Sequence, residues 1–342
     1  MSAVVTVGAG PLQPLLDDPA VTDVLVNGAD GVWVDRGSGL ERCPVRFRDD
    51  DAVRTLAVRL AAAAGRRLDA AVPFADARLA GGVRLHAALA PTAGPGTCIS
   101  LRMHRRGGFP VSAFCDDPVV EDVLLACVAG RLALVVSGGT GTGKTTLLDA
   151  LLGHADPRER IVIVEDAGEL APALPHVVRL AARPPNVEGA GGIDLRHLVR
   201  QALRMRPDRI VVGEIRGAEI VDLLLALNTG HDGGATTVHA NGVHEVPARL
   251  EALGALADLP RAALHSQMAA ALDVVIHLDR RGVGARRVSG IAVLDRGADG
   301  LVTAIPVLQA ESGRWQRGPG ATSLVRRLHD RGVSLPSAVT GP

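Results

Sequence analysis

Short apolar runs alternate with stretches of helical apolar spacing from Arg131 onward. The strand-like runs are 132–137 (LALVVS), 161–166 (IVIVED), 209–215 (RIVVGEI) and 234–240 (GATTVHA). Helical spacing separates them at 144–153, 194–205 and 218–230, the last closed by Gly230. Apolar strands that alternate with helices are typical of an α/β fold with a mostly parallel sheet covered on both faces. Three later runs, at 273–280, 286–295 and 301–309, predict shorter strands in a meander packed on that core.

The first 108 residues have a different pattern, with strand pieces at 21–28, 31–37 and 44–49 separated by glycine and aspartate turns. A helical stretch at 51–69 follows, and then strand-like runs at 81–91 and 97–104. This order predicts a smaller α+β domain with antiparallel strands over 1–108. Glycine, proline and charge concentrate over 104–118, so we expect a linker at 109–118 and a second domain over 119–342.

Composition limits the classes of function. The chain has 342 residues, 47% of them apolar, which is enough for two domains with buried cores. Basic and acidic residues balance at 37 each and aromatic residues make up 2%, so we expect no direct nucleic-acid binding. The four cysteines lack metal-site spacing, the N-terminus lacks the pattern of a signal peptide, and no apolar run approaches about 18 residues. These features indicate a cytosolic protein or one docked peripherally on a membrane machine.

The segment GGTGTGKTT lies between a predicted strand and a predicted helix and fits the phosphate-binding pattern GxxxxGK(S/T). Its glycines let backbone N–H groups surround phosphate oxygens, and the helix N-terminus adds the positive end of its dipole. Lys144 is the only lysine in the chain, and its compact ammonium can enter a cradle that a broad guanidinium cannot. The alternative, a glycine-rich turn with an incidental lysine, is disfavoured by this strand–helix context. The expected nucleotide-binding residues are Gly138, Gly139, Thr140, Gly141, Thr142, Gly143, Lys144, Thr145 and Thr146, with the Thr145 hydroxyl available to Mg²⁺.

Acidic residues follow two of the predicted strands. Glu214 closes an apolar strand, and strand ends lie beside the phosphate cradle in a doubly wound sheet, so Glu214 is placed to polarise a water that attacks the γ-phosphate. The spacing also fits an ordinary surface glutamate. Gly213 stands where an aspartate is usual, which leaves Mg²⁺ to Thr145, phosphates and water. Glu165 and Asp166 fit either a role around the magnesium waters or a solvated turn.

Two histidines, His231 and His239, flank the strand 234–240. Their separation of eight residues matches no zinc pattern, and no cysteine lies nearby. By spacing alone, each is an ordinary core or loop histidine.

Four segments in one order, GGTGTGKTT, IVIVEDAGEL, LRMRPDRIVVGEIRGAE and NTGHDGGATTVHANG, resemble the Walker A, Asp box, Walker B and His box of the type II and type IV secretion ATPase superfamily. The resemblance covers nearly the whole chain and looks closest to the branch that serves Tad/Flp pilus assembly and conjugal-transfer loci. It implies a RecA-like ATPase core preceded by a PAS-like, sensor-like N-terminal domain. It places Glu165 in the Asp box and Glu214 in Walker B, and it makes His231 and His239 a pair that senses the γ-phosphate.

The segments 21–37, 73–91 and 96–106 resemble the N-terminal domain of that family, which is hinged over the nucleotide. The likeness implies that Arg84 and Arg102 reach the phosphates as a ring of subunits closes. Either residue also fits a solvated strand charge, because 36 of the 37 basic residues are arginines. The chain departs from the family at Gly81, where Asp is common, and in its short linker. It also lacks the four-cysteine zinc module of the type II branch.

The resemblance implies a homo-hexamer that hydrolyses ATP with Mg²⁺ at the inner face of the cytoplasmic membrane. Its expected partners are an inner-membrane platform protein of a pilus or secretion system and, indirectly, a pilin or secreted substrate. Two other classes stay open on the sequence. One is a RecA-like helicase or DNA translocase, which the neutral charge and scarce aromatic residues oppose. The other is a nucleotide-dependent switch without productive turnover, which the intact Glu214 opposes.

Overall fold

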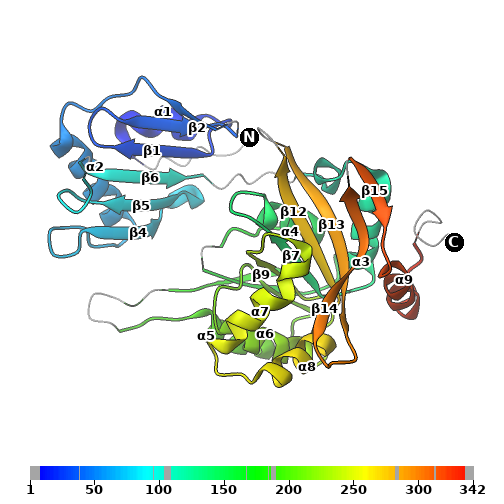
Figure 1. Ribbon diagram of the computed structural model, residues 1–342. Helices are drawn as coiled ribbons and strands as arrows, with labels where there is room; N and C mark the ends of the chain where they lie inside the picture. The colour runs from blue at the N-terminus through cyan, green and yellow to red at the C-terminus, as the bar shows by residue number, and fades with distance from the viewer. Residues whose placement is uncertain are drawn as a thin grey trace. The chain divides into compact units, whose positions relative to one another are not determined.

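The chain divides into two compact units, Met1–Gly107 and Gly108–Pro342 (Figure 1). This computed structural model describes residues 8–37, 39–94, 96–103, 109–166, 168–183, 185, 190–281, 285–311 and 313–335. Each unit has a sheet and a hydrophobic core of its own.

The first unit is built on a six-stranded antiparallel sheet in the order β3-β2-β1-β6-β5-β4. Its strands are β1 (Asp23–Asn27), β2 (Val32–Asp35), β3 (Leu40–Arg42), β4 (Phe74–Arg78), β5 (Arg84–Ala88) and β6 (Cys98–Arg102). Its helical segments are η1 (Gly10–Leu12), α1 (Gln13–Asp17), α2 (Asp50–Ala63) and η2 (Ala80–Gly82). The antiparallel domain expected from the sequence is therefore present.

Helix α2 buries one face against this sheet, because its apolar residues recur at three- and four-residue spacing. The Asp49 carboxylate caps its N-terminus by accepting from the N–H of Ala52 at 2.8 Å. The helix ends at Ala63, well before the predicted residue 69, since the N–H of Arg66 turns back to the carbonyl oxygen of Ala61 at 2.9 Å.

Two strand predictions in this unit need correction. The stretch 44–49 is not a strand: Pro44 has no N–H to donate, and the Phe47 side chain is instead buried in the core. Strand β4 was not among the predicted elements, because the residues that it buries are the alanines Ala75 and Ala77, which carry little strand signal. The predicted run 97–104 ends at His104, which lies outside the described residues.

The second unit is built on a nine-stranded sheet in the order β15-β14-β13-β12-β7-β11-β10-β8-β9. Its strands are β7 (Leu134–Gly138), β8 (Ile161–Glu165), β9 (Val177–Ala181), β10 (Arg209–Val212), β11 (Ala235–Val238), β12 (Val274–Arg281), β13 (Ala285–Arg296), β14 (Val302–Glu311) and β15 (Arg314–Arg317). Its helical segments are η3 (Val111–Phe114), α3 (Pro118–Ala129), α4 (Lys144–Leu152), α5 (Leu195–Ala202), η4 (Leu203–Met205), α6 (Glu219–Leu227), η5 (Val243–Glu245), α7 (Val246–Ala255), α8 (Arg261–Ala271) and α9 (Ala321–Asp330).

The sheet of this unit is parallel from β12 through β7, β11, β10 and β8 to β9, as the apolar strands predict. The three last strands continue it as an antiparallel ribbon. The predicted meander is therefore present, but it extends the edge of the sheet instead of packing on it. Shorter strands were expected here, but β13 has 12 residues and β14 has 10, against five in β7.

Helices cover both faces of this sheet (Figure 1). Leu134 and Val136 of β7 pack with residues of α3, α4 and α9, whereas Val135 between them packs with residues of α5, α6, α7 and α8. The segment 109–118, expected to be a linker, lies within the second unit, and Val111 and Phe114 are buried in its core.

A buried ion pair ties the start of β10 to the loop before β8. The guanidinium of Arg209, 3% exposed, pairs with the carboxylate of Glu159, and its Nη2 also donates to the carbonyl oxygen of Val128 at 2.9 Å. The same carboxylate accepts from Arg131 at 3.0 Å. A charge held in this way becomes costly when its partner is removed.

We therefore expect Glu159→Ala to lower the free energy of unfolding by roughly 3–5 kcal/mol, because it leaves the Arg209 guanidinium buried without a counter-charge. The measurement is urea unfolding followed by circular dichroism. The matched control is Arg158→Ala in the same loop, which removes an exposed guanidinium and should change little. Equal, small effects of both substitutions would contradict the structural role given to this pair.

Candidate nucleotide-binding site

The segment GGTGTGKTT runs from the end of β7 at Gly138, through a loop, into the first turn of α4, which starts at Lys144. This is the context that the sequence predicts. Gly143 has a φ of 92°, a left-handed conformation that suits glycine, and a Cβ there would lie 3.1 Å from Arg286 and 3.3 Å from Phe114. The Thr142 hydroxyl closes the loop by donating to the carbonyl oxygen of Gly139 at 2.9 Å. Thr145 and Thr146, half-buried, follow in the first turn of the helix.

Lys144 is 7% exposed, and its ammonium lies at the beginning of this loop. Its Nζ donates to the carbonyl oxygens of Gly138 and Gly139 at 3.0 and 2.8 Å and lies 3.3 Å from Nδ1 of His239. Burial lowers the pKa of Lys144, which the charge of Glu214 opposes and that of Arg216 reinforces.

Parallel pairing brings four of the predicted site residues to one edge of the sheet. Strands β7, β11, β10 and β8 are neighbours, so their carboxyl ends carry Gly138, His239, Glu214 and Glu165 side by side. Nε2 of His239 lies 2.7 Å from Oε1 of Glu214. On its other side, Oε2 of Glu214 accepts from Nε of Arg216 at 2.6 Å.

These contacts form one continuous hydrogen-bonded chain that runs from Lys144 through His239 and Glu214 to Arg216. His239 lies between the ammonium and the carboxylate. A neutral imidazole suits this place, because Nδ1 can accept from the ammonium while the Nε2–H donates to the carboxylate; the tautomer is assigned from these partners. Burial and the charge of Lys144 lower the pKa of His239, and Glu214 opposes this shift. The imidazole is therefore neutral at neutral pH.

Glu165 ends β8 and is 5% exposed. Its Oε1 accepts from the backbone N–H groups of Glu169 and Leu170, each at 3.0 Å. Its side chain also fills the space beside Gly213, where a Cβ would lie 2.6 Å from Cγ of Glu165. The glycine at the position of the usual aspartate therefore makes room for this neighbouring acid.

Sequence reasoning missed Arg216, which contacts Glu214 more closely than any other cation in the described part of the chain. The residue is held in place by Glu219 at the start of α6, whose Oε1 accepts from the N–H groups of Arg216 and Gly217. The sequence did contain a signal for this contact, because Arg216 follows Glu214, the acid at the strand end, by only two residues.

Of the other predicted site residues, His231 belongs to the second unit but not to this chain of contacts, and Arg84 and Arg102 belong to the first unit. His231 precedes β11, at the opposite edge of the sheet from His239, and its Nδ1 lies 3.0 Å from the carbonyl oxygen of Ala226. Arg84 and Arg102 face each other as Cα partners on β5 and β6 of the first unit. Nε of Arg102 donates to Oδ1 of Asp23 at 2.9 Å.

The described residues contain no cluster of three or more histidine, cysteine or acidic side chains able to hold a metal ion. The site nonetheless fits Mg²⁺ with ATP, because the Thr145 hydroxyl stands in the first turn of α4 and phosphates and water can complete the coordination. The carboxylate of Glu165 is already engaged by two N–H groups.

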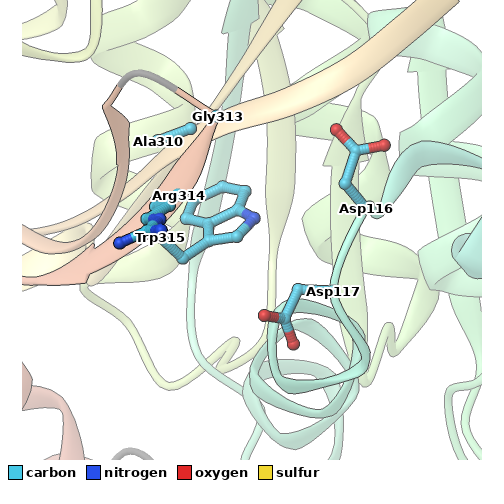
Figure 2. Close-up of a pocket in the computed structure, with 6 residues that line it drawn as sticks. All are labelled: Asp116, Asp117, Ala310, Gly313, Arg314 and Trp315. Carbon is cyan, nitrogen blue, oxygen red and sulfur yellow. The ribbon is translucent and has the colours of Figure 1, made fainter.

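A hollow of about 320 Å³ lies between the start of α3 and the β14–β15 hairpin (Figure 2). Trp315 borders it together with Asp116 and Asp117. Both acids already have partners, since Asp117 caps α3 through the N–H of Val119 and Asp116 pairs with Arg287.

Comparison with known proteins assigns the chain to a family. The family model described as Type II/IV secretion system protein matches residues 5–296. A Mycobacterium tuberculosis protein that carries the provisional name of conjugal transfer protein is 58% identical over 316 residues, 90% of each chain. The type IV secretion system protein PtlH of Bordetella pertussis is 32% identical and covers 81% of this chain and 91% of its own.

The solved structure of the ATPase DotB from Legionella pneumophila has a similar fold, with a TM-score of 0.55 over 96% of this chain and 93% of that one at 18% identity. No helix in the described ranges combines the length and apolar character that a bilayer crossing needs. The names of the relatives point to conjugal transfer and type IV secretion and not specifically to Tad/Flp pili. The chain belongs to the type II/IV secretion system protein family and is homologous to secretion ATPases, which hydrolyse ATP.

Proposed function

We propose that this protein is the ATP-hydrolysing motor of a secretion or pilus machine. The observation that supports this most strongly is the hydrogen-bonded chain of Lys144, His239 and Glu214 at the ends of three neighbouring parallel strands. It joins a cation at the phosphate-binding loop to a carboxylate able to act as a base. The surrounding architecture, a RecA-like core with a PAS-like first unit, is part of the same proposal.

In this mechanism the N–H groups of 138–146 hold the phosphates and Lys144 exchanges its loop carbonyls for phosphate oxygens. Bound Mg²⁺ would neutralise charge on the β- and γ-phosphates, with Thr145 as its protein ligand. Glu214 accepts the proton of the attacking water. His239, through its Nε2–H, and Arg216 keep the carboxylate of Glu214 oriented toward that task.

Glu165 acts as a positioning residue in this proposal. Its buried carboxylate holds the backbone of residues 169–170, next to Gly213 in the strand end that carries Glu214. The Asp box of the family implies that Glu165 influences the waters around magnesium. In this proposal it does so indirectly, by fixing the backbone of residues 169–170 and the position of Glu214.

Arg84 and Arg102 are proposed to supply positive charge to the phosphates late in the cycle, from the first unit of the same or a neighbouring subunit. Their adjacent places on β5 and β6 let the two guanidinium groups act together. His231, which precedes the amino end of β11, is proposed to sense whether the γ-phosphate is present and to transmit this to a subunit interface.

The proposed working form is a homo-hexamer at the inner face of the cytoplasmic membrane. Its relatives bear conjugal transfer and type IV secretion names, which supports a machine of that kind; Tad/Flp pilus assembly is the more specific proposal. The expected partner is a membrane platform protein, and the load is a pilin or secreted substrate. Phosphate release that rises with added DNA would contradict this and favour a DNA translocase.

We expect Glu214→Gln to bind ATP with near-normal affinity and to lose turnover by about 10²–10⁴-fold, because the amide cannot take a proton from water. Steady-state phosphate release and equilibrium ATP binding measure the two effects separately. Glu311→Gln, the same change at an exposed position on β14, serves as the control. Near-normal turnover by Glu214→Gln would remove the assigned base.

The neutral state of His239 predicts a pH effect on stability. The folded-state pKa is lowered from an ordinary 6.5, so the unfolded chain takes up this proton first as the pH falls. The wild type should therefore lose stability more steeply from about pH 7 to pH 5 than His239→Gln. Urea unfolding at a series of pH values tests this. The contributions of the other histidines cancel in the comparison, because both proteins contain them. Parallel pH profiles would show that His239 does not stay neutral in the folded state.

A further inference from the structure

A cavity of about 550 Å³ adjoins the first residues of the phosphate-binding loop. Gly139 and Thr140 form one wall, and His239, the partner of the Lys144 ammonium, borders the same space. Glu245 and Arg249 contribute the far side, from η5 and α7. The cavity therefore continues the cradle on the side of the loop where Lys144 lies.

Helix α7 turns Arg249 toward this cavity. Val246, Leu250 and Leu253 are buried in the core and fix the helix face, whereas Arg249 is exposed. Within the described ranges no hydrogen bond or ion pair holds its guanidinium. Glu245, one turn earlier, accepts instead from the N–H of Asn241 at 3.3 Å.

The charge of Arg249 already acts on the site, since it contributes to the lowered pKa of His239. A cation without a partner, beside a phosphate cradle, is suited to an anion that enters the cavity. The fork of a guanidinium can donate to two oxygens of one phosphate, which an ammonium cannot do with the same geometry. In a loop of this kind the lysine reaches the β- and γ-phosphates, so the cavity beside its partner His239 receives the terminal phosphate.

We propose that Arg249 binds the γ-phosphate of ATP held in the cradle of its own subunit and so makes the site distinguish ATP from ADP. This inference rests on the proposed function. ADP lacks the group that Arg249 would contact, and its binding depends on the loop, Lys144 and Thr145.

The test is calorimetric titration of the full chain with Mg²⁺ and either ADP or the non-hydrolysable ATP analogue AMP-PNP. Arg249→Gln should weaken AMP-PNP binding by about 10- to 100-fold, the effect of losing hydrogen bonds between charged groups, and leave ADP binding within about twofold. The AMP-PNP affinity of Arg249→Lys should lie between those of the wild type and Arg249→Gln, because lysine keeps the charge and loses the forked pair of donors. Arg326→Gln, a change of an exposed arginine on α9, is the matched control and should alter neither affinity.

Equal weakening of ADP and AMP-PNP, or no change in either, would overturn the assignment of Arg249. A structural defect is recognised by the same comparison, because it would reduce both affinities and lower the unfolding temperature. If the wild type binds and hydrolyses ATP while Arg249→Gln keeps the wild-type ratio of affinities, this inference alone fails. If the wild type binds neither nucleotide, the proposed function fails with it.

Discussion

Parallel pairing of β7, β11, β10 and β8 is the constraint on which the site depends. Both faces of these strands are covered by helices, so their side chains are buried and carry no charge between the strand ends. Charged groups are tolerated only where the strands end and the backbone leaves the sheet. Because the strands run in the same direction, their carboxyl ends meet at one edge, and that edge brings Lys144, His239 and Glu214 into contact.

The cost of burying an ammonium explains the chemistry of this edge. A lone buried charge is strongly unfavourable, and Lys144 meets two loop carbonyls and one imidazole nitrogen. The carboxylate of Glu214 compensates the charge through that imidazole without touching the ammonium. In the proposed function this arrangement lets Lys144 exchange weak partners for phosphate oxygens, which a direct ion pair with Glu214 would oppose.

Glycine serves two different purposes around the site. At Gly143 the backbone needs a left-handed conformation to turn from strand to helix. At Gly213 the conformation is ordinary, and the missing Cβ leaves space for the side chain of Glu165. Glu165, which closes β8, therefore lies against the strand end that carries Glu214, and the absence of an aspartate at residue 213 is part of the packing.

The sequence by itself determined the alternation of strands and helices, the antiparallel first unit and the strand–loop–helix context of Lys144, because each depends on local periodicity and glycine placement. It placed Glu214 at a strand end for the same reason. Only the tertiary structure decided that His239 lies between Lys144 and Glu214, that His231 lies at the other edge, and that Arg216 donates to the carboxylate of Glu214. It also decided that the last strands extend the sheet and that Phe47, in the stretch 44–49, is buried in the core of the first unit. These features depend on strand order and on contacts between distant segments, which periodicity along one chain does not encode.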